Sequence, residues 1–288
     1  MGLGNAMHYY VLLIIFFTPL TVLSKTIITY PGGLSGPPYV KKLLELSLEK
    51  TKSDFGDFEL ISTYKNETHP RLIRHLDDGT YKNFVIKVSV TDDVLQNYNI
   101  IKFPIDRGMS GFRVAFSSVK MDQKNCDNIN LDNILDEPIV QGSGWLDTDI
   151  LKYNHFKVHP VATNQQMFNM IARKRVRYFF RGINELLYES SKFPNLFIEP
   201  CFALKYPLPR FFVTNKRDID IAKRIETGLE RAYKDGSLIK LWRTYYIKSI
   251  QLANMKERQI FELKNPFIKT LDDDYLKYDF KFSELDDH

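Results

Sequence analysis

The connection formed by residues 142–148 carries groups that could bind an anion. It follows an apolar stretch and opens a helical pattern, with Ser143 and Gly144 directly before Trp145. Backbone N–H groups at a helix N-terminus attract negative charge, and the Ser143 hydroxyl could add a donor. The spacing matches neither a dinucleotide fingerprint nor a Walker loop. An ordinary turn, in which Ser143 or Asp147 caps the helix, is the open alternative.

A second candidate for anion binding is Arg181, which ends an apolar strand pattern directly before Gly182 and a helical stretch. In open α/β sheets, ligands bind beyond the carboxyl ends of the strands, where a forked guanidinium could hold a carboxylate or phosphate. The alternative is structural, because Glu185 lies one helical turn later and could pair with Arg181.

Four further candidates come from the first third of the chain. Tyr30 and Tyr39 lie on either side of a loop rich in proline and glycine, and Ser89 and Thr91 end a later strand pattern. A tyrosine just after the first strand would line a cleft if the sheet opens there, and the two hydroxyls could reach a ligand. Core packing is the alternative for the tyrosines, and capping of the next helix is the alternative for Ser89 and Thr91.

Catalytic and metal-binding patterns are weak. None of the six histidines has the spacing of a known nucleophile or metal motif, since His155 and His159 are separated by a β-like stretch. We therefore expect no catalytic residue, no metal and no cofactor.

Cys126 and Cys201 could pair in an oxidising compartment, or they could be two unpaired core residues. In a chain able to build a full core, the sequence favours the unpaired interpretation.

Length and charge limit the possible architectures and partners. The chain has 288 residues, of which 44% are apolar and 26% charged, as in folded globular proteins. At this length a single core stops growing efficiently, which predicts two lobes with a cleft between them. The net charge of +5 is too small and too dispersed for a nucleic-acid partner. Acidic residues are concentrated in residues 271–288, which we expect to form a solvated tail.

The first 24 residues contain no Asp, Glu, Lys or Arg, and residues 11–23 form an apolar run. This length fits the core of a signal peptide and is too short for a comfortable membrane span. We expect export with cleavage near Ser24, which would leave a mature protein that is soluble and either periplasmic or secreted. An uncleaved membrane anchor and a buried first element are the alternatives.

Strand and helix patterns alternate along the rest of the chain. Extended patterns are predicted at residues 25–30, 58–62, 84–90, 100–104, 112–117, 138–141, 157–162, 177–180, 196–204 and 210–214. Helical patterns are predicted at residues 39–50, 71–76, 145–154, 165–174, 183–191, 219–234 and 238–261. This alternation predicts an α/β fold with mostly parallel sheets. Gly108 and Gly111, and later Pro207 and Pro209, indicate two crossings between the lobes.

With this organisation, the chain resembles the type 2 periplasmic binding protein superfamily, near the extracellular solute-binding family 3. The most specific stretches are residues 39–58, 103–113, 141–151, 179–185 and 204–213. The resemblance implies a two-lobed α/β fold, in which each lobe has a mixed, mostly parallel sheet flanked by helices and two strands cross between the lobes. It implies hinges near residues 107–111 and 206–210, and no chemistry on the ligand.

The expected organisation is a signal peptide at 1–24, lobe 1 at 25–106 and 210–270, lobe 2 at 107–209, and an acidic C-terminal tail at 271–288. In amino-acid binders of this superfamily an arginine of lobe 1 grips the ligand carboxylate, but Val94 stands at that place here. An aspartate of lobe 2 usually holds the amino group, whereas this chain has Arg181 there. An arginine favours an anionic or neutral polar ligand over a cationic one.

The sequence thus predicts a monomeric, non-enzymatic, extracytoplasmic protein that captures a small amino-acid-like molecule and presents it to a membrane transporter of the ABC type. A sensory module of the same fold, feeding a membrane receptor, is the main alternative. An extracytoplasmic enzyme that uses Arg181 and Asp147 is a third. The predicted ligand-binding residues are Tyr30, Tyr39, Ser89, Thr91, Ser143, Gly144, Trp145 and Arg181.

Overall fold

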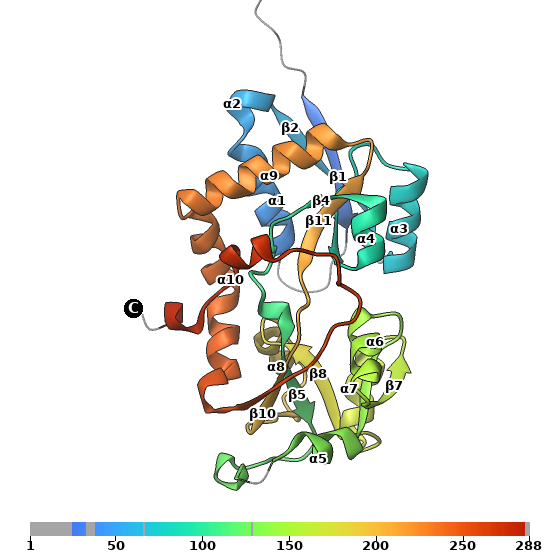
Figure 1. Ribbon diagram of the computed structural model, residues 1–288, viewed down its shortest axis with the longest axis vertical. Helices are drawn as coiled ribbons and strands as arrows, with labels where there is room; N and C mark the ends of the chain where they lie inside the picture. The colour runs from blue at the N-terminus through green and yellow to red at the C-terminus, as the bar shows by residue number, and fades with distance from the viewer. Residues whose placement is uncertain (1–24, 33–37, 66, 128, 286–288) are drawn as a thin grey trace, which may run out of the picture.

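Two groups of strands lie one above the other in Figure 1, each with its own helices. The computed structural model describes residues 25–32, 38–65, 67–127 and 129–285. The predicted signal peptide, residues 1–24, lies outside this part of the chain. Among the described residues, no helix has both the length and the hydropathy needed to cross a membrane.

The upper group, lobe 1, contains a parallel pair of strands and an antiparallel sheet with the order β3-β11-β4. A parallel bridge from Thr29 to Phe84 links the two. The strands are β1 (Thr26–Gly32), β2 (Phe58–Lys65), β3 (Ile86–Ser89), β4 (Tyr98–Ile101) and β11 (Arg210–Asn215). The helices are α1 (Tyr39–Glu49), α2 (Lys52–Phe55), α3 (His69–Asp78), α4 (Asp92–Asn97) and α9 (Ile219–Lys234).

Helices α1 and α9 form the core of this lobe because their apolar residues recur at helical spacing. Leu43, Leu44 and Leu48 of α1 are buried, while the charged residues of the helix stay exposed or half-buried. The two helices pack closely at Gly228, where a Cβ atom would lie 1.9 Å from the Ser47 carbonyl oxygen. A larger residue at this position would therefore force the helices apart.

The lower group, lobe 2, has one mixed sheet with the order β12-β10-β5-β8-β6-β7, and β9 pairs with β5. Its strands are β5 (Phe112–Ser117), β6 (Pro138–Gly142), β7 (Lys157–Val161), β8 (Tyr178–Gly182), β9 (Phe197–Ile198), β10 (Phe202–Lys205) and β12 (Gln259–Glu262). Its helices are η1 (Met109–Gly111), η2 (Gln123–Asn125), α5 (Leu131–Asp136), α6 (Leu146–Tyr153), α7 (Asn164–Ala172) and α8 (Leu186–Lys192). Strands β5 and β8 are buried almost throughout, as expected for strands covered on both faces.

The chain passes from the first sheet to the second between β4 and β5, and returns between β10 and β11. Helix α10 (Ser237–Ala253) packs against α8 of lobe 2 and against α1 and α9 of lobe 1, and it runs along one side of the molecule in Figure 1. The predicted α/β fold with two lobes is confirmed, but its sheets are mixed instead of mostly parallel, because β5 and β11 each pair antiparallel with their neighbours.

The segment after α10 differs from the prediction. The helical pattern predicted to reach residue 261 ends at Ala253, because Asn254 adopts the left-handed conformation with φ 44°. After the short helix η3 (Met255–Glu257), β12 pairs in parallel with β10. The assignment of all of residues 210–270 to lobe 1 is therefore wrong at its end, since β12 belongs to the sheet of lobe 2.

Residues 263–285, called the C-terminal strap below, are not a solvated tail. They include η4 (Asp273–Tyr278) and η5 (Phe282–Leu285) and run across the middle of the molecule in Figure 1. Tyr275 is buried against Phe211 of β11, and Glu284 forms two hydrogen bonds of 3.0 Å with the guanidinium of Arg107. The expected acidic tail is thus corrected: aromatic residues and ion pairs hold this segment on the hinge region.

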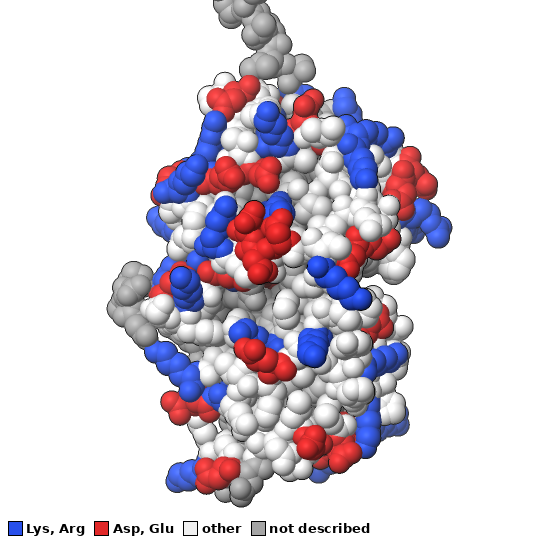
Figure 2. All heavy atoms as spheres, in the orientation of Figure 1, with Lys and Arg blue, Asp and Glu red and all other residues white. Residues whose placement is uncertain are grey.

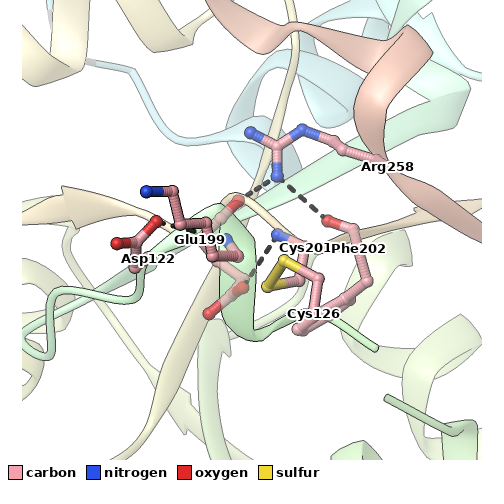
Figure 3. Close-up of a disulfide and its surroundings, with 7 residues drawn as sticks. Asp122, Cys126, Glu199, Cys201, Phe202 and Arg258 are labelled. Carbon is pink, nitrogen blue, oxygen red and sulfur yellow. Dashed lines mark hydrogen bonds between the residues drawn. A yellow bond between two sulfur atoms is a disulfide. The ribbon is translucent and has the colours of Figure 1, made fainter. Parts of the chain in front are cut away.

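Cys126 and Cys201 form a disulfide, so the favoured interpretation of two unpaired thiols is wrong (Figure 3). The bond joins the long connection after β5 to the residue before β10. Cys201 and its surroundings are held further by polar contacts: its N–H donates to Glu199, and Arg258 donates to the backbone carbonyls of Glu199 and Phe202. Disulfides of this kind form in oxidising compartments.

Candidate ligand-binding site

One face of the β3-β11 pair carries two basic side chains. Strand register places Lys87 opposite Phe212 and Ser89 opposite Arg210. Residues that oppose each other in an antiparallel pair, and residues two apart on one strand, point to the same face. Lys87, Ser89 and Arg210 therefore share a face, while the alternating residues Val88 and Phe211 are buried on the other.

Lys87 lines a small cavity of about 30 Å³ in lobe 1. Tyr30, Pro31, Val40, Lys41, Leu44, Leu72, Val85 and Phe212 form the rest of its lining. Burial and the nearby guanidinium of Arg210 lower the pKa of Lys87 to about 8, and Asp106 and Glu185 only partly oppose this shift. Among the described residues, no carboxylate lies within ion-pair distance of either Lys87 or Arg210.

The carboxyl group of Glu185, in lobe 2, lies close enough to this face for Arg210 to lower its pKa. Burial would raise the pKa of its carboxyl group, but Arg181, Arg210 and Arg113 outweigh burial and lower it, so Glu185 is ionised. Its side chain keeps 25% of its surface exposed. Two basic groups of lobe 1 and this carboxylate of lobe 2 thus act on one another electrostatically.

Arg181 lies at the end of β8, where its charge is neutralised within lobe 2. Its Nη2 atom lies 2.7 Å from Glu185 Oε1 and 2.6 Å from Glu189 Oε1, and its guanidinium packs against the rings of Trp145 and Phe179. Burial alone would lower the pKa of Arg181, but the two glutamates raise it. The structural alternative from the sequence, an ion pair with Glu185, is confirmed. Anion binding by Arg181 stays a prediction.

Asp147 belongs to a neighbouring buried network in lobe 2. Its Oδ1 atom lies 2.5 Å from Arg113 Nη2 and accepts a hydrogen bond of 2.7 Å from the Tyr206 hydroxyl. Arg113 and Tyr206 are almost completely buried. Because burying a charge is costly unless it is paired, these contacts give Asp147 and Arg113 a structural role.

The predicted ligand-binding residues of lobe 1 lie in different environments. Tyr30 and Ser89 lie near Lys87, the first on the same cavity and the second on the same sheet face. Tyr39 is completely buried, and its hydroxyl donates a hydrogen bond of 2.8 Å to the Ile105 carbonyl. The expectation that Tyr39 lines a cleft is therefore wrong, because its ring is part of the core. Thr91 caps α4 by accepting a hydrogen bond from the Val94 N–H.

The predicted residues of lobe 2 lie at the start of α6. Ser143 and Gly144 are exposed, and a Cβ atom at Gly144 would meet only open space. Trp145 is half-buried, with its ring over Gly142 and the Arg181 guanidinium. Neither Ser143 nor Asp147 caps the helix with its side chain. Ligand binding by these three residues stays a prediction.

The ligand-binding residues predicted from the sequence do not include Lys87, Arg210 or Glu185. The alternation in residues 84–90 already placed Lys87 on the face of Ser89, so that signal was present in the sequence. Arg210 joins them only through the register of β11 against β3, two strands that are separated by more than 100 residues. Nothing in the local sequence encodes this pairing.

No protein-family model matches the sequence, and no curated protein matches it. Solved structures do match. A periplasmic His/Glu/Gln/Arg/opine family-binding protein from Silicibacter pomeroyi, in complex with lysine, has a TM-score of 0.57 at 12% identity, over 77% of this chain and 97% of that one. The VFT2 domain of BvgS from Bordetella pertussis has a TM-score of 0.58 at 14% identity, over 76% and 92%. A mutant of ArgBP from T. maritima has 0.52 at 14% identity, over 77% and 94%.

These similarities establish the fold. The chain has the two-lobed fold that periplasmic amino-acid-binding proteins share, and the predicted resemblance to the type 2 periplasmic binding protein superfamily is confirmed for the fold. Binding proteins and a histidine kinase sensor domain are among the similar structures.

Proposed function

We propose that the protein captures a small anionic or amino-acid-like molecule between its lobes, with the ligand carboxylate on Lys87 and Arg210. The observation that carries this proposal is the pair of basic side chains on one face of β3 and β11, for which the described residues supply no ion-pair partner. Two neighbouring cations in a partly buried place repel each other, and an anion relieves that repulsion.

The rest of the ligand would contact groups from both lobes. Tyr30 and Ser89 lie beside Lys87, and the ionised Glu185 approaches from lobe 2. A carboxylate from lobe 2 could accept a hydrogen bond from an amino or hydroxyl group of the ligand. The protein then acts by binding, since Asp147 and Arg181, the residues of the enzymatic alternative, are held in internal ion pairs.

A role in transport, in which closing lobes present the ligand to a membrane permease, fits the similarity to periplasmic binding proteins. The similarity to a histidine kinase sensor domain supports a second candidate, a sensory module that feeds a membrane receptor. A periplasmic or secreted location is supported by the disulfide and by the apolar leader.

The experiment begins with mass spectrometry of small molecules that the purified protein releases on denaturation. Calorimetric titration then uses the released molecule, together with L-glutamate, L-glutamine and L-lysine as probes of similar size and different charge. We expect the acidic and neutral amino acids to bind more tightly than L-lysine. Arg210→Gln and Lys87→Gln should each weaken binding of the tightest probe at least tenfold, because each removes a charged hydrogen-bond donor.

Lys82→Gln is the matched control, because Lys82 is an exposed lysine that precedes the same strand. It should leave affinity unchanged. Lys87→Gln should not lower the unliganded melting temperature, since the surroundings of Lys87 disfavour its charge. Wild-type affinity in both Arg210→Gln and Lys87→Gln would refute the proposed carboxylate site.

A further inference from the structure

A second cavity lies away from the Lys87 face, beneath the C-terminal strap. Its volume is about 410 Å³, within the range of small-molecule sites. The walls come from both crossings between the lobes and from the strap. The lining includes Gly108, Leu208, Leu263, Asp273, Leu276 and Asp279.

Much of this lining is apolar. Leu208 and Leu263 are buried beside the second crossing, while Leu276 of η4 keeps 43% of its surface exposed. A ligand that covers an exposed leucine next to a concave surface removes apolar area from water, which favours binding. The cavity therefore suits a molecule with an apolar part.

The charged lining is acidic. Lys205 is the one basic residue among the described lining residues, and its ammonium lies 2.8 Å from Glu262. Asp273 and Asp279 have no ion-pair partner among the described residues. Figure 2 shows acidic side chains gathered on this face, over the part of the strap that contains η4 in Figure 1. The charge of the cavity thus favours a cation.

Asp279 is the most informative of these residues. Its carboxyl group lies against Gly108, where a Cβ atom would come within 2.6 Å of Asp279 Cγ. Gly108 has φ 76°, a conformation that suits glycine, so the hinge leaves room for this carboxyl group. The Oδ1 atom of Asp279 is buried and accepts no hydrogen bond within the described chain. Burial and the nearby Asp106 raise the pKa of Asp279 to about 7, and the guanidinium of Arg107, which is paired with Glu284, only partly opposes this shift.

We propose that this cavity is a second binding site, specific for a small organic cation whose ammonium group contacts Asp279 and whose apolar part contacts Leu208, Leu271 and Leu276. The cation supplies a hydrogen-bond donor and a countercharge to Asp279, since the nearby Arg107 is already paired with Glu284. The walls include both crossings, so a ligand that binds this arrangement also stabilises it.

The test uses three probes of one shape and different charge, namely benzylamine, benzyl alcohol and benzoate. Binding to the full chain is measured by calorimetry at pH 8, where Asp279 is ionised and benzylamine is protonated. We expect benzylamine to bind at least tenfold more tightly than benzyl alcohol, and benzoate to bind least. Equal binding of the three probes, or no binding of benzylamine, would overturn the proposal.

The variants locate the site. Asp279→Asn should abolish the preference for benzylamine, whereas Asp274→Asn, an exposed strap residue that does not line the cavity, should keep it. Asp273→Asn, which carries little risk to folding because Asp273 is exposed, should weaken benzylamine binding at least threefold. Loss of binding in Glu185→Gln with retention in Asp279→Asn and Asp273→Asn would place benzylamine between the lobes and overturn the proposal.

Discussion

The two lobes use their basic residues in opposite ways. In lobe 2, Arg113 and Arg181 are buried and paired with Asp147, Glu185 and Glu189. In lobe 1, Lys87 and Arg210 are half-buried and have no carboxylate at ion-pair distance within the described chain. An arginine at the end of a strand is therefore available to a ligand only where the fold does not already supply its counterion.

The largest difference should appear in stability. Arg181→Met should lower the free energy of unfolding by about 3–5 kcal/mol, because it leaves Glu189 buried without its partner. Lys87→Met should cause no loss, since the surroundings of Lys87 already disfavour its charge. Urea unfolding of both variants, without ligand, measures this contrast.

The double variant Arg181→Met with Glu189→Leu is the control, and it should recover part of the lost stability because no buried charge is left unpaired. An Arg181→Met protein with wild-type stability and no ligand affinity would contradict this assignment. It would instead support Arg181 as the anion-binding residue that its position in the sequence suggests.

Removing the disulfide also tests the difference between the two lobes, because both of its cysteines belong to lobe 2. Replacing Cys126 by Ser and Cys201 by Ala should lower the free energy of unfolding by about 2–4 kcal/mol, since the bond closes a long loop in the unfolded chain. Ligand affinity should stay unchanged, because neither cysteine lies near Lys87 or Arg210. Urea unfolding and calorimetric titration of the double variant test both statements. A loss of affinity at full stability would show that lobe 2 is coupled to the site in another way.

Local patterns predicted much of the fold. The alternation of strands and helices predicted an α/β protein, and the leucines of α1 predicted its buried face. The end of α10 was missed because β12 exists through its pairing with β10, which no local pattern encodes. The disulfide was missed because two cysteines without a motif say nothing of their distance in space.

The site was predicted less well, for a related reason. Arg181 stood out because it ends a strand, but its partner Glu189 lies eight residues away across a turn, and its burial is a tertiary property. Ser89 was found and Lys87 overlooked, although both lie on one face of β3. Composition and position identify polar residues near a cleft, but only tertiary structure shows which of them lack a partner.

The smallest expected effect is a pH dependence that separates Lys87 from Arg210. The pKa of Lys87 is lowered to about 8, so this side chain is mainly charged at pH 7 and mainly neutral at pH 9 without ligand. An anionic ligand favours the charged form and must recover the proton at pH 9, which weakens binding about tenfold between pH 7 and pH 9. Calorimetry in buffers of different ionisation enthalpy should also detect this proton uptake.

Lys87→Arg is the decisive control, because it keeps the positive charge and does not titrate in this range. Its affinity should be nearly constant from pH 7 to pH 9. Asp279 titrates near pH 7 at the strap, so Asp279→Asn should leave the loss of affinity above pH 8 in place. A wild-type affinity that stays constant up to pH 9 would mean that Lys87 does not hold the ligand carboxylate. Arg210 would then be the one basic residue of the pair that binds the anion.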